Sequence, residues 1–82
     1  MNRLKAAVEA AKAAGVRVEL WKADLATGWN ITLSGAAKGQ LIGTTYQNLA
    51  QRVLEYAGQQ LIRASDETRR HGEELLEQAV GA

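Results

Sequence analysis

Apolar residues recur at helical spacing near the start of the chain. Leu4, Val8 and Ala11 are separated by four and three positions, so they fall on one face of a helix. Asn2 precedes this run and is a suitable N-cap, because its side chain can accept hydrogen bonds from the first free backbone N–H groups. Gly15 follows the run and supplies the left-handed conformation on which helices commonly end. The pattern predicts an amphipathic helix between these two residues.

From residue 16 the period of the apolar positions changes to two, which is typical of a half-buried strand. Apolar and polar residues alternate over residues 16–21 and again over residues 29–34. The apolar members of both runs are Val16, Val18, Leu20, Trp29, Ile31 and Leu33. The turn-rich segment from Asp24 to Gly28 separates the runs, and Gly28 suits the positive-φ position of a short loop. We therefore expect a β-hairpin that points Trp29 into the core.

The sheet is predicted to have two or three strands, depending on whether a third strand forms beside this hairpin. Gln40, Leu41 and Ile42 form a brief apolar segment within the glycine-containing stretch from Gly35 to Gly43. This stretch lacks the Gly-Lys-Ser/Thr ending of a phosphate-binding loop. We interpret its glycines as backbone flexibility at a strand edge and at the start of the next helix, with anion capture at the helix start near Thr44 as the alternative.

A long amphipathic helix is predicted after Thr44 or Thr45, either of which can act as its N-cap. The residues that keep the spacing of one helical face are Tyr46, Ala50, Val53, Ala57, Leu61 and Ala64. Leu54 and Ile62 lie partly off this stripe and widen the apolar surface. We interpret the extra width as core packing, with the seam of a homodimer as the alternative.

A break in the helical pattern is expected near Ser65. Apolar residues nearly vanish between Arg63 and Gly72, and Ser65 followed by two acidic residues is typical of a helix start. The apolar residues that then return predict a short closing helix, and they are Leu75, Leu76, Ala79 and Val80. The alternative is one continuous helix of roughly 50 Å at 1.5 Å per residue, which would require a partner chain.

The predicted order of helix, two or three strands, long helix and short helix defines an α+β fold. A short antiparallel sheet with the helices packed on one face lets each element bury its apolar side. At 82 residues the chain has room for one hydrophobic core, so we expect a single domain over residues 1–82. Many of the apolar residues are alanine and the chain has no cysteine, so we expect a thin core and a homodimer as one means of stabilising it.

Charge and hydropathy restrict the environment of the protein. Basic residues outnumber acidic ones at the start of the chain and acidic ones outnumber basic ones at its end, although the formal net charge is only +1. No positively charged segment followed by an apolar one opens the chain, and the apolar runs are too short to cross a membrane. We therefore expect a cytoplasmic location and no membrane partner.

The usual groups of enzymatic chemistry are missing from this sequence. There is no cysteine nucleophile, and the single histidine, His71, lies in a charged run that is typical of a solvated helix face. His71 and Glu74 share a helical face, but one such pair is too few ligands for a metal site. We therefore expect no catalytic residue, no cofactor and no bound metal.

The best candidate for a binding surface is the polar face of the hairpin. Strand parity places the large aromatic side chain of Trp21 on this face, where exposure of such a group is unusual. The predicted partner-binding residues are Arg17, Glu19, Trp21, Asn30 and Thr32. Aromatic and arginine side chains dominate the energetics of protein interfaces, which favours a protein partner. The structural alternative is that a bulge turns Trp21 inward or that Arg17 covers it.

Nucleic acid is the alternative partner, bound by the basic first third of the chain. The residues that would contact phosphates are Arg3, Lys5, Lys12, Arg17 and Lys22. Dedicated nucleic-acid binders usually concentrate more positive charge on one face, so this pattern ranks second.

The order of helix, strands and helix over residues 3–61 resembles the double-stranded RNA-binding domain. The segment from Val16 to Ala57 is also similar to the three-strand-plus-helix modules of phage integrase arms and plant AP2 domains. In the RNA-binding family the second helix opens with a lysine-rich motif that grips phosphates. That place is occupied here by Thr44, Thr45, Tyr46, Gln47 and Asn48. The resemblance therefore implies a topology and not an activity.

In format, a short, alanine-rich, cysteine-free chain without a catalytic constellation resembles the small phage-encoded inhibitor proteins, anti-CRISPR proteins among them. The resemblance implies a non-catalytic inhibitor or adaptor that docks on a larger bacterial protein or nucleoprotein, such as a CRISPR effector complex. The alternatives are a nucleic-acid-binding domain and a homodimeric structural module.

Overall fold

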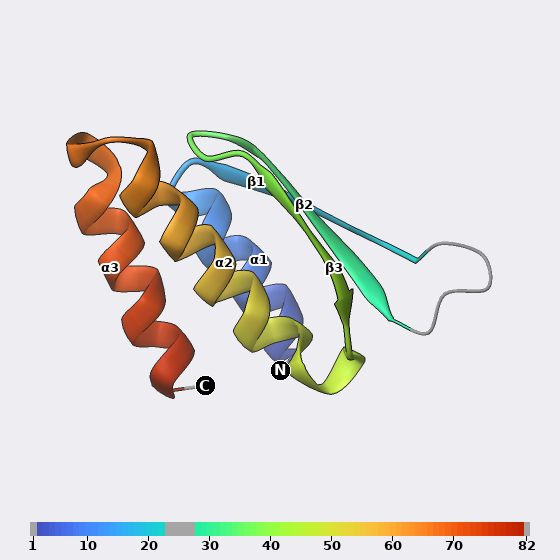
Figure 1. The fold of residues 1–82 in the computed structure, drawn as a ribbon. Coiled ribbons are helices and arrows are strands. Elements are labelled where there is room, and N and C mark those ends of the chain that lie inside the picture. The colour runs from blue at the N-terminus through green and yellow to red at the C-terminus, as the bar shows by residue number, and fades with distance from the viewer. Residues whose placement is uncertain (1, 23–27, 82) are drawn as a thin grey trace.

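The computed structural model describes residues 2–22 and 28–81, and its elements follow the α+β order expected from the sequence (Figure 1). The helices and strands are α1 (Arg3–Ala13), β1 (Val16–Trp21), β2 (Trp29–Gly35), β3 (Gly39–Thr44), the 3₁₀ turn η1 (Tyr46–Asn48), α2 (Leu49–Ala64) and α3 (Asp66–Gly81). The three strands form one antiparallel sheet in the order β1-β2-β3, so of the two strand numbers left open by the sequence, three is correct. No helix in the described part of the chain is long and apolar enough to cross a membrane.

The first helix begins and ends as its sequence predicts. The side-chain oxygen of Asn2 accepts hydrogen bonds from the backbone N–H groups of Leu4 at 2.9 Å and Lys5 at 3.3 Å. At the other end, Gly15 has a φ of 90°, which turns the chain out of the helix and into β1. The residues of α1 that are buried against the core are Ala7 and Ala11.

The pairing of β1 with β2 is regular, whereas the pairing of β2 with β3 contains a β-bulge. Val16 pairs with Gly35, and the same register continues without a shift as far as Trp21 and Asn30. Between β2 and β3 the register shifts by one residue, so that two residues of β3 lie opposite Asn30. Of the expected turn from Asp24 to Gly28, all but Gly28 lies outside the described residues.

The core lies between the sheet and the helices, which are on one side of it (Figure 1). Both α1 and α2 contact the sheet, and they also pack against each other. The side chains that close this core from both layers are Ala7, Ala11, Val16, Ile31, Leu33, Leu49, Val53, Ala57 and Leu61. Trp29 packs against this cluster from its edge, so the inward orientation predicted by strand parity is confirmed. On the other face of the sheet, most of the described residues are exposed.

The start of the long helix differs from the prediction. Neither threonine caps it: Thr44 is buried at the end of β3, and Thr45 precedes η1 without a side-chain capping bond. The α-helix begins only at Leu49. Tyr46 was predicted to lie on the apolar stripe of this helix, but it lies in η1 before the helix begins. Its exposed ring lies beside that of Trp29, with ring centroids 6.4 Å apart.

The predicted break at Ser65 is confirmed, and it rules out a continuous helix. Ser65 is extended, and its hydroxyl accepts a hydrogen bond from the backbone N–H of Thr68 at 3.3 Å, as an N-cap does. The hydroxyl of Thr68 also donates to the carbonyl of Leu61, which fastens the turn to the end of α2. Helix α3 is not short, because it begins directly after the cap and is as long as α2, at 16 residues.

Helix α3 packs against α2 across a pair of glycines. A Cβ atom added to Gly58 would lie 2.7 Å from the carbonyl oxygen of Gly72, and one added to Gly72 would lie 2.5 Å from that of Gly58. The two backbones therefore approach as closely as glycine allows. Leu54 is buried and Ile62 is partly buried on this side of α2. The extra apolar width of α2 is thus core packing against α3, and it is not a free homodimer seam.

Candidate binding surface

The solvent face of the sheet brings together most of the residues predicted to bind a partner. We call this surface the outer face, and it consists of Arg17, Glu19, Trp21, Thr32, Ser34, Gln40 and Ile42. Register places Glu19, Thr32 and Gln40 in one row across the three strands. The outer face therefore presents a mixture of polar, charged and apolar groups on a rigid sheet.

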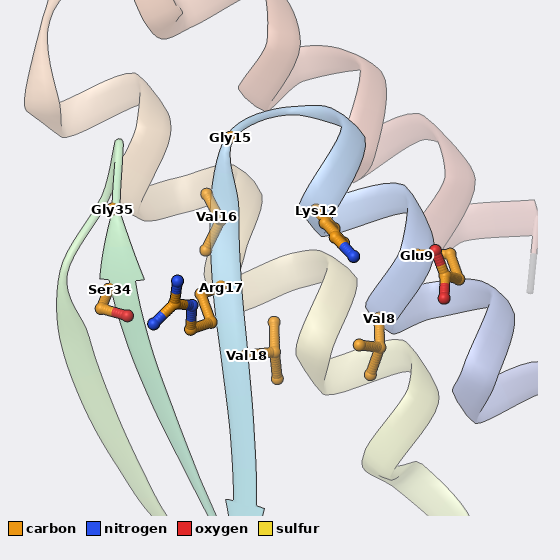
Figure 2. Close-up of a pocket in the computed structure, with 9 residues that line it drawn as sticks. All are labelled: Val8, Glu9, Lys12, Gly15, Val16, Arg17, Val18, Ser34 and Gly35. Atoms are coloured by element: carbon orange, nitrogen blue, oxygen red, sulfur yellow. The ribbon is translucent and has the colours of Figure 1, made fainter.

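Trp21 is exposed on the outer face and is held in one orientation. Its indole Nε1–H donates a hydrogen bond of 2.9 Å to the hydroxyl of Thr32 on the neighbouring strand. Trp21 as a residue is still 40% exposed. The regular pairing of β1 with β2 excludes a bulge that turns Trp21 inward. Arg17 does not cover it, because Arg17 pairs with Ser34 and points toward it (Figure 2).

Asn30 has a structural role that its strand position did not predict. Its side chain is only 5% exposed, and its Oδ1 accepts a hydrogen bond of 3.2 Å from the backbone N–H of Gly43. Gly43 has a φ of 83° and belongs to the β-bulge, so the amide of Asn30 holds the bulge in place. Asn30 is therefore not available to a partner, unlike the other predicted residues of this surface.

We expect Asn30→Ala to destabilise the fold by about 0.5–1.5 kcal/mol, because the β-bulge would lose the hydrogen bond that the N–H of Gly43 donates to Asn30. Denaturant unfolding followed by circular dichroism measures this change. Ser34→Ala is the matched control, because Ser34 is exposed on the same strand and is expected to change stability by less than about 0.5 kcal/mol. Equal stability of the two variants would contradict the role assigned to Asn30.

Sequence reasoning missed Ile42, which is the most exposed apolar residue of the outer face. Its side chain is 71% exposed, and it lies in the bulge of β3 opposite Asn30, in the same row as Trp21. The signal that could have identified it is strand parity, because Leu41 points into the core and its neighbour must point outward. Exposed apolar side chains therefore lie on the outer face at both β1 and β3, on either side of Asn30.

The basic residues of the nucleic-acid alternative do not gather on one surface. Arg3, Lys5 and Lys12 are exposed on α1, which packs on the core side of the sheet. Arg17 lies on the outer face, and Lys22 is exposed just after β1. Lys12 and Arg17 come closest to a cluster, as they line the two sides of a groove between α1 and β1 (Figure 2). The structure thus spreads this charge over two sides of the molecule.

A few charged and titratable side chains line hollows among the described residues. The groove between α1 and β1 has a volume of ≈ 730 Å³, and its charged residues are Glu9, Lys12 and Arg17. His71 is exposed on α3 beside Glu74. Among residues 2–22 and 28–81, no group of three or more histidine, cysteine, aspartate or glutamate side chains is placed to hold a metal ion.

No protein-family model, curated protein or solved structure matches this chain. A functional proposal for it therefore depends on its own geometry. The feature with the clearest functional meaning is the outer face, where an exposed tryptophan is fixed by a hydrogen bond on a regular pair of strands.

Proposed function

We propose that this chain is a non-catalytic protein-binding domain that acts as an inhibitor or adaptor and docks through its outer face. The observation that carries the proposal is Trp21, whose ring is exposed but already oriented by Thr32. A pre-oriented side chain loses little conformational freedom on binding, so more of its buried area becomes affinity. Tryptophan is also among the residues that contribute most to protein interfaces.

The composition of the outer face favours a protein over a nucleic acid. Arg17 is balanced by Glu19 on the same strand, so the face has no excess of positive charge to attract phosphates. Trp21 and Ile42 add exposed apolar surface at one end of the outer face, and the rows beyond them carry hydroxyl, amide and charged groups. Protein interfaces commonly combine aromatic and apolar side chains with such polar groups.

A bacterial protein complex is the proposed partner, and a CRISPR effector complex is the first one to test. Support for this class comes from the format of the chain, which resembles small phage-encoded inhibitors that work by occupying a surface. Such an inhibitor needs a rigid docking face and no chemistry of its own.

We expect Trp21→Ala to weaken partner binding by about 30-fold or more, because interface hot spots contribute at least about 2 kcal/mol. The partner is captured from bacterial lysate with the tagged wild-type chain, identified, purified and titrated by biolayer interferometry. Tyr46→Ala is the matched control, since Tyr46 is an exposed aromatic residue outside the outer face. Circular dichroism verifies that both variants are folded.

Two results would count against the proposal. Unchanged partner affinity in folded Trp21→Ala would remove the outer face from consideration. Tight binding of random duplex DNA or RNA that weakens steeply with salt would instead favour the nucleic-acid alternative. Fluorescence anisotropy of labelled duplexes at low and moderate salt makes that second measurement.

A further inference from the structure

The groove between α1 and β1 combines aliphatic walls with basic side chains. Val8 lines it on the side of α1, and Val18 lines it on the side of β1 (Figure 2). Both valines are only half-buried, so each keeps apolar surface that a further contact could cover. The basic residues of this groove are Lys12 and Arg17, and both are exposed. The groove therefore presents aliphatic surface beside two positive charges.

A second hollow lies at the turn that joins β2 to β3. Its volume is ≈ 340 Å³, and the last turn of α2 forms part of its lining. Its charged residues are both basic, with Lys38 in the turn and Arg63 near the end of α2. Gly35 lines this hollow and also lines the groove between α1 and β1. The two hollows therefore meet at Gly35.

The residues where the two hollows meet have no long side chains. Gly15 and Gly35 have φ values of 90° and 98°, in the region that favours glycine. A Cβ atom added to Gly35 would lie 2.6 Å from the carbonyl oxygen of Gly15, so the backbone itself requires glycine there. The next residue is the small Ala36, and the side chains at this junction therefore do not separate the hollows. We call the two hollows together the basic groove.

The basic groove concentrates positive charge that the chain as a whole lacks. Four basic residues and one acidic residue line it, which gives +3 against a formal net charge of +1 for the chain; they are Lys12, Arg17, Lys38, Arg63 and Glu9. Within residues 2–22 and 28–81 the only ion pair joins Arg52 to Glu55, so a salt bridge neutralises none of the four cations there. The acidic residues closest to Arg17 and Arg63 in the sequence line neither hollow, and they are Glu19, Asp66 and Glu67. The basic groove is thus complementary to an anionic occupant.

The lining of the basic groove favours a protein segment as that occupant. Acidic side chains of such a segment match the four cations, and an aliphatic side chain matches Val8 and Val18. A nucleic acid strand offers phosphates but no aliphatic side chain for the two valines. Arg17 and Ser34 belong both to the outer face and to the lining of the groove. A protein held on the outer face therefore has a continuous surface along which one of its segments reaches the groove.

We propose that the basic groove binds an extended acidic segment of the protein partner that carries at least one aliphatic side chain. The inference rests on the proposed function, since it treats this segment as part of a partner docked on the outer face. Carboxylates of the segment lie beside Lys12 and Arg17 on one side of the junction and beside Lys38 and Arg63 on the other. An aliphatic side chain packs between Val8 and Val18. The charges steer and orient the segment, and the aliphatic contact distinguishes it from other anions.

An NMR titration of the isotope-labelled chain with a synthetic peptide of glutamate and leucine tests the proposal. A peptide of about eight residues extends to roughly 27 Å, which is long enough to follow a surface on a molecule whose shorter extents are 25 and 16 Å. We expect saturable shifts of the backbone amides of Gly15, Val18, Gly35 and Lys38, with a dissociation constant below about 1 mM. The double variant K12E/K38E is expected to raise this constant by about tenfold or more, because two attractive contacts become repulsive.

The double variant K5E/K22E is the matched control. Lys5 and Lys22 are exposed and line neither hollow, and their replacement changes the net charge by the same amount. Salt screens charges more than roughly 10 Å away, so this variant is expected to change the affinity for the peptide by less than about twofold. Circular dichroism verifies that both double variants are folded.

Three results would overturn the proposal. The first is the absence of saturable shifts up to about 1 mM peptide, the weak end of specific association. The second is an equal loss of affinity in the two double variants, which would trace the attraction to overall charge. The third is equal affinity for an all-glutamate peptide or for single-stranded DNA of the same charge, which would leave the two valines without a role. The peptide titration involves neither the partner nor Trp21, so its failure is distinguishable from a failure of docking on the outer face.

Discussion

Replacing Ile31 with alanine is expected to lower the free energy of unfolding by about 2–5 kcal/mol. Ile31 lies on the central strand, is fully buried, and is among the largest side chains of the core. Its removal leaves a cavity that helices on one side and two neighbouring strands cannot close without moving. A domain of this size has a total stability of roughly 4–12 kcal/mol, so this loss is a large share of it. Urea unfolding followed by circular dichroism measures the change.

The matched control is the same substitution at Ile42. Ile42 lies on the outer face with most of its surface in water, so Ile42→Ala is expected to change stability by less than about 0.5 kcal/mol. Because both variants replace isoleucine with alanine, the difference between their stabilities measures the effect of burial. A loss at Ile42 as large as that at Ile31 would mean that the outer face is covered in solution, which would itself identify an interface.

Replacing Gly72 with alanine is expected to separate α3 from α2 and to cost about 1–3 kcal/mol or more. The new Cβ would lie 2.5 Å from the carbonyl oxygen of Gly58 and 2.9 Å from a side-chain carbon of Ile62. The first of these atoms belongs to a helix backbone, so a change of side-chain rotamer cannot relieve the contact. Thermal unfolding is expected to show a lower midpoint and weaker cooperativity.

Gly81→Ala controls for the helix propensity of alanine. Gly81 is also in α3, but an added Cβ meets nothing within 4 Å. Alanine is a better helix former than glycine by up to about 1 kcal/mol, so this variant is expected to be as stable as the wild type or slightly more stable. If Gly72→Ala behaved like Gly81→Ala, the close approach of the two helices would be contradicted.

Much of the fold could be predicted because its elements obey simple periodicities. The two-residue period of the strands correctly assigned Trp29 to the core and Trp21 to solvent. The cap at Asn2 and the break at Ser65 were predictable because each depends on a side chain bonding to nearby backbone. Each of these features depends on residues that are close together in the sequence, so a single sequence is sufficient to predict it.

The parts that escaped prediction depend on contacts between distant residues. Gly72 carries no side chain to signal that it is buried, so the segment before Leu75 had no apolar pattern although it belongs to α3. Thr44 was expected as a helix cap, but it belongs to β3 and pairs with Trp29 at the end of the sheet. In both cases the partner that decides the structure lies elsewhere in the chain.

In the candidate site, too, the features that depend on local sequence were predicted and those that depend on distant residues were not. Strand parity was sufficient for Arg17, Glu19, Trp21 and Thr32, which lie on the outer face. Parity could not reveal that Asn30 would be buried by the β-bulge, because the bulge arises from an extra residue in a different strand. Nor could it show that the basic residues of α1 would lie on the side of the molecule away from the outer face.

The sheet is a simple meander in which consecutive strands pair with each other. Helix α3 likewise packs against α2, the helix that directly precedes it in the chain. Neighbours in sequence are therefore neighbours in space throughout most of the molecule. The main exception is the contact between α1 and α2, which brings the first helix against one that begins after all three strands. Chains dominated by local contacts search few loop closures before reaching the native state, and they fold rapidly. The packing of α1 on α2 therefore ties the first helix of the chain to one that follows the whole sheet.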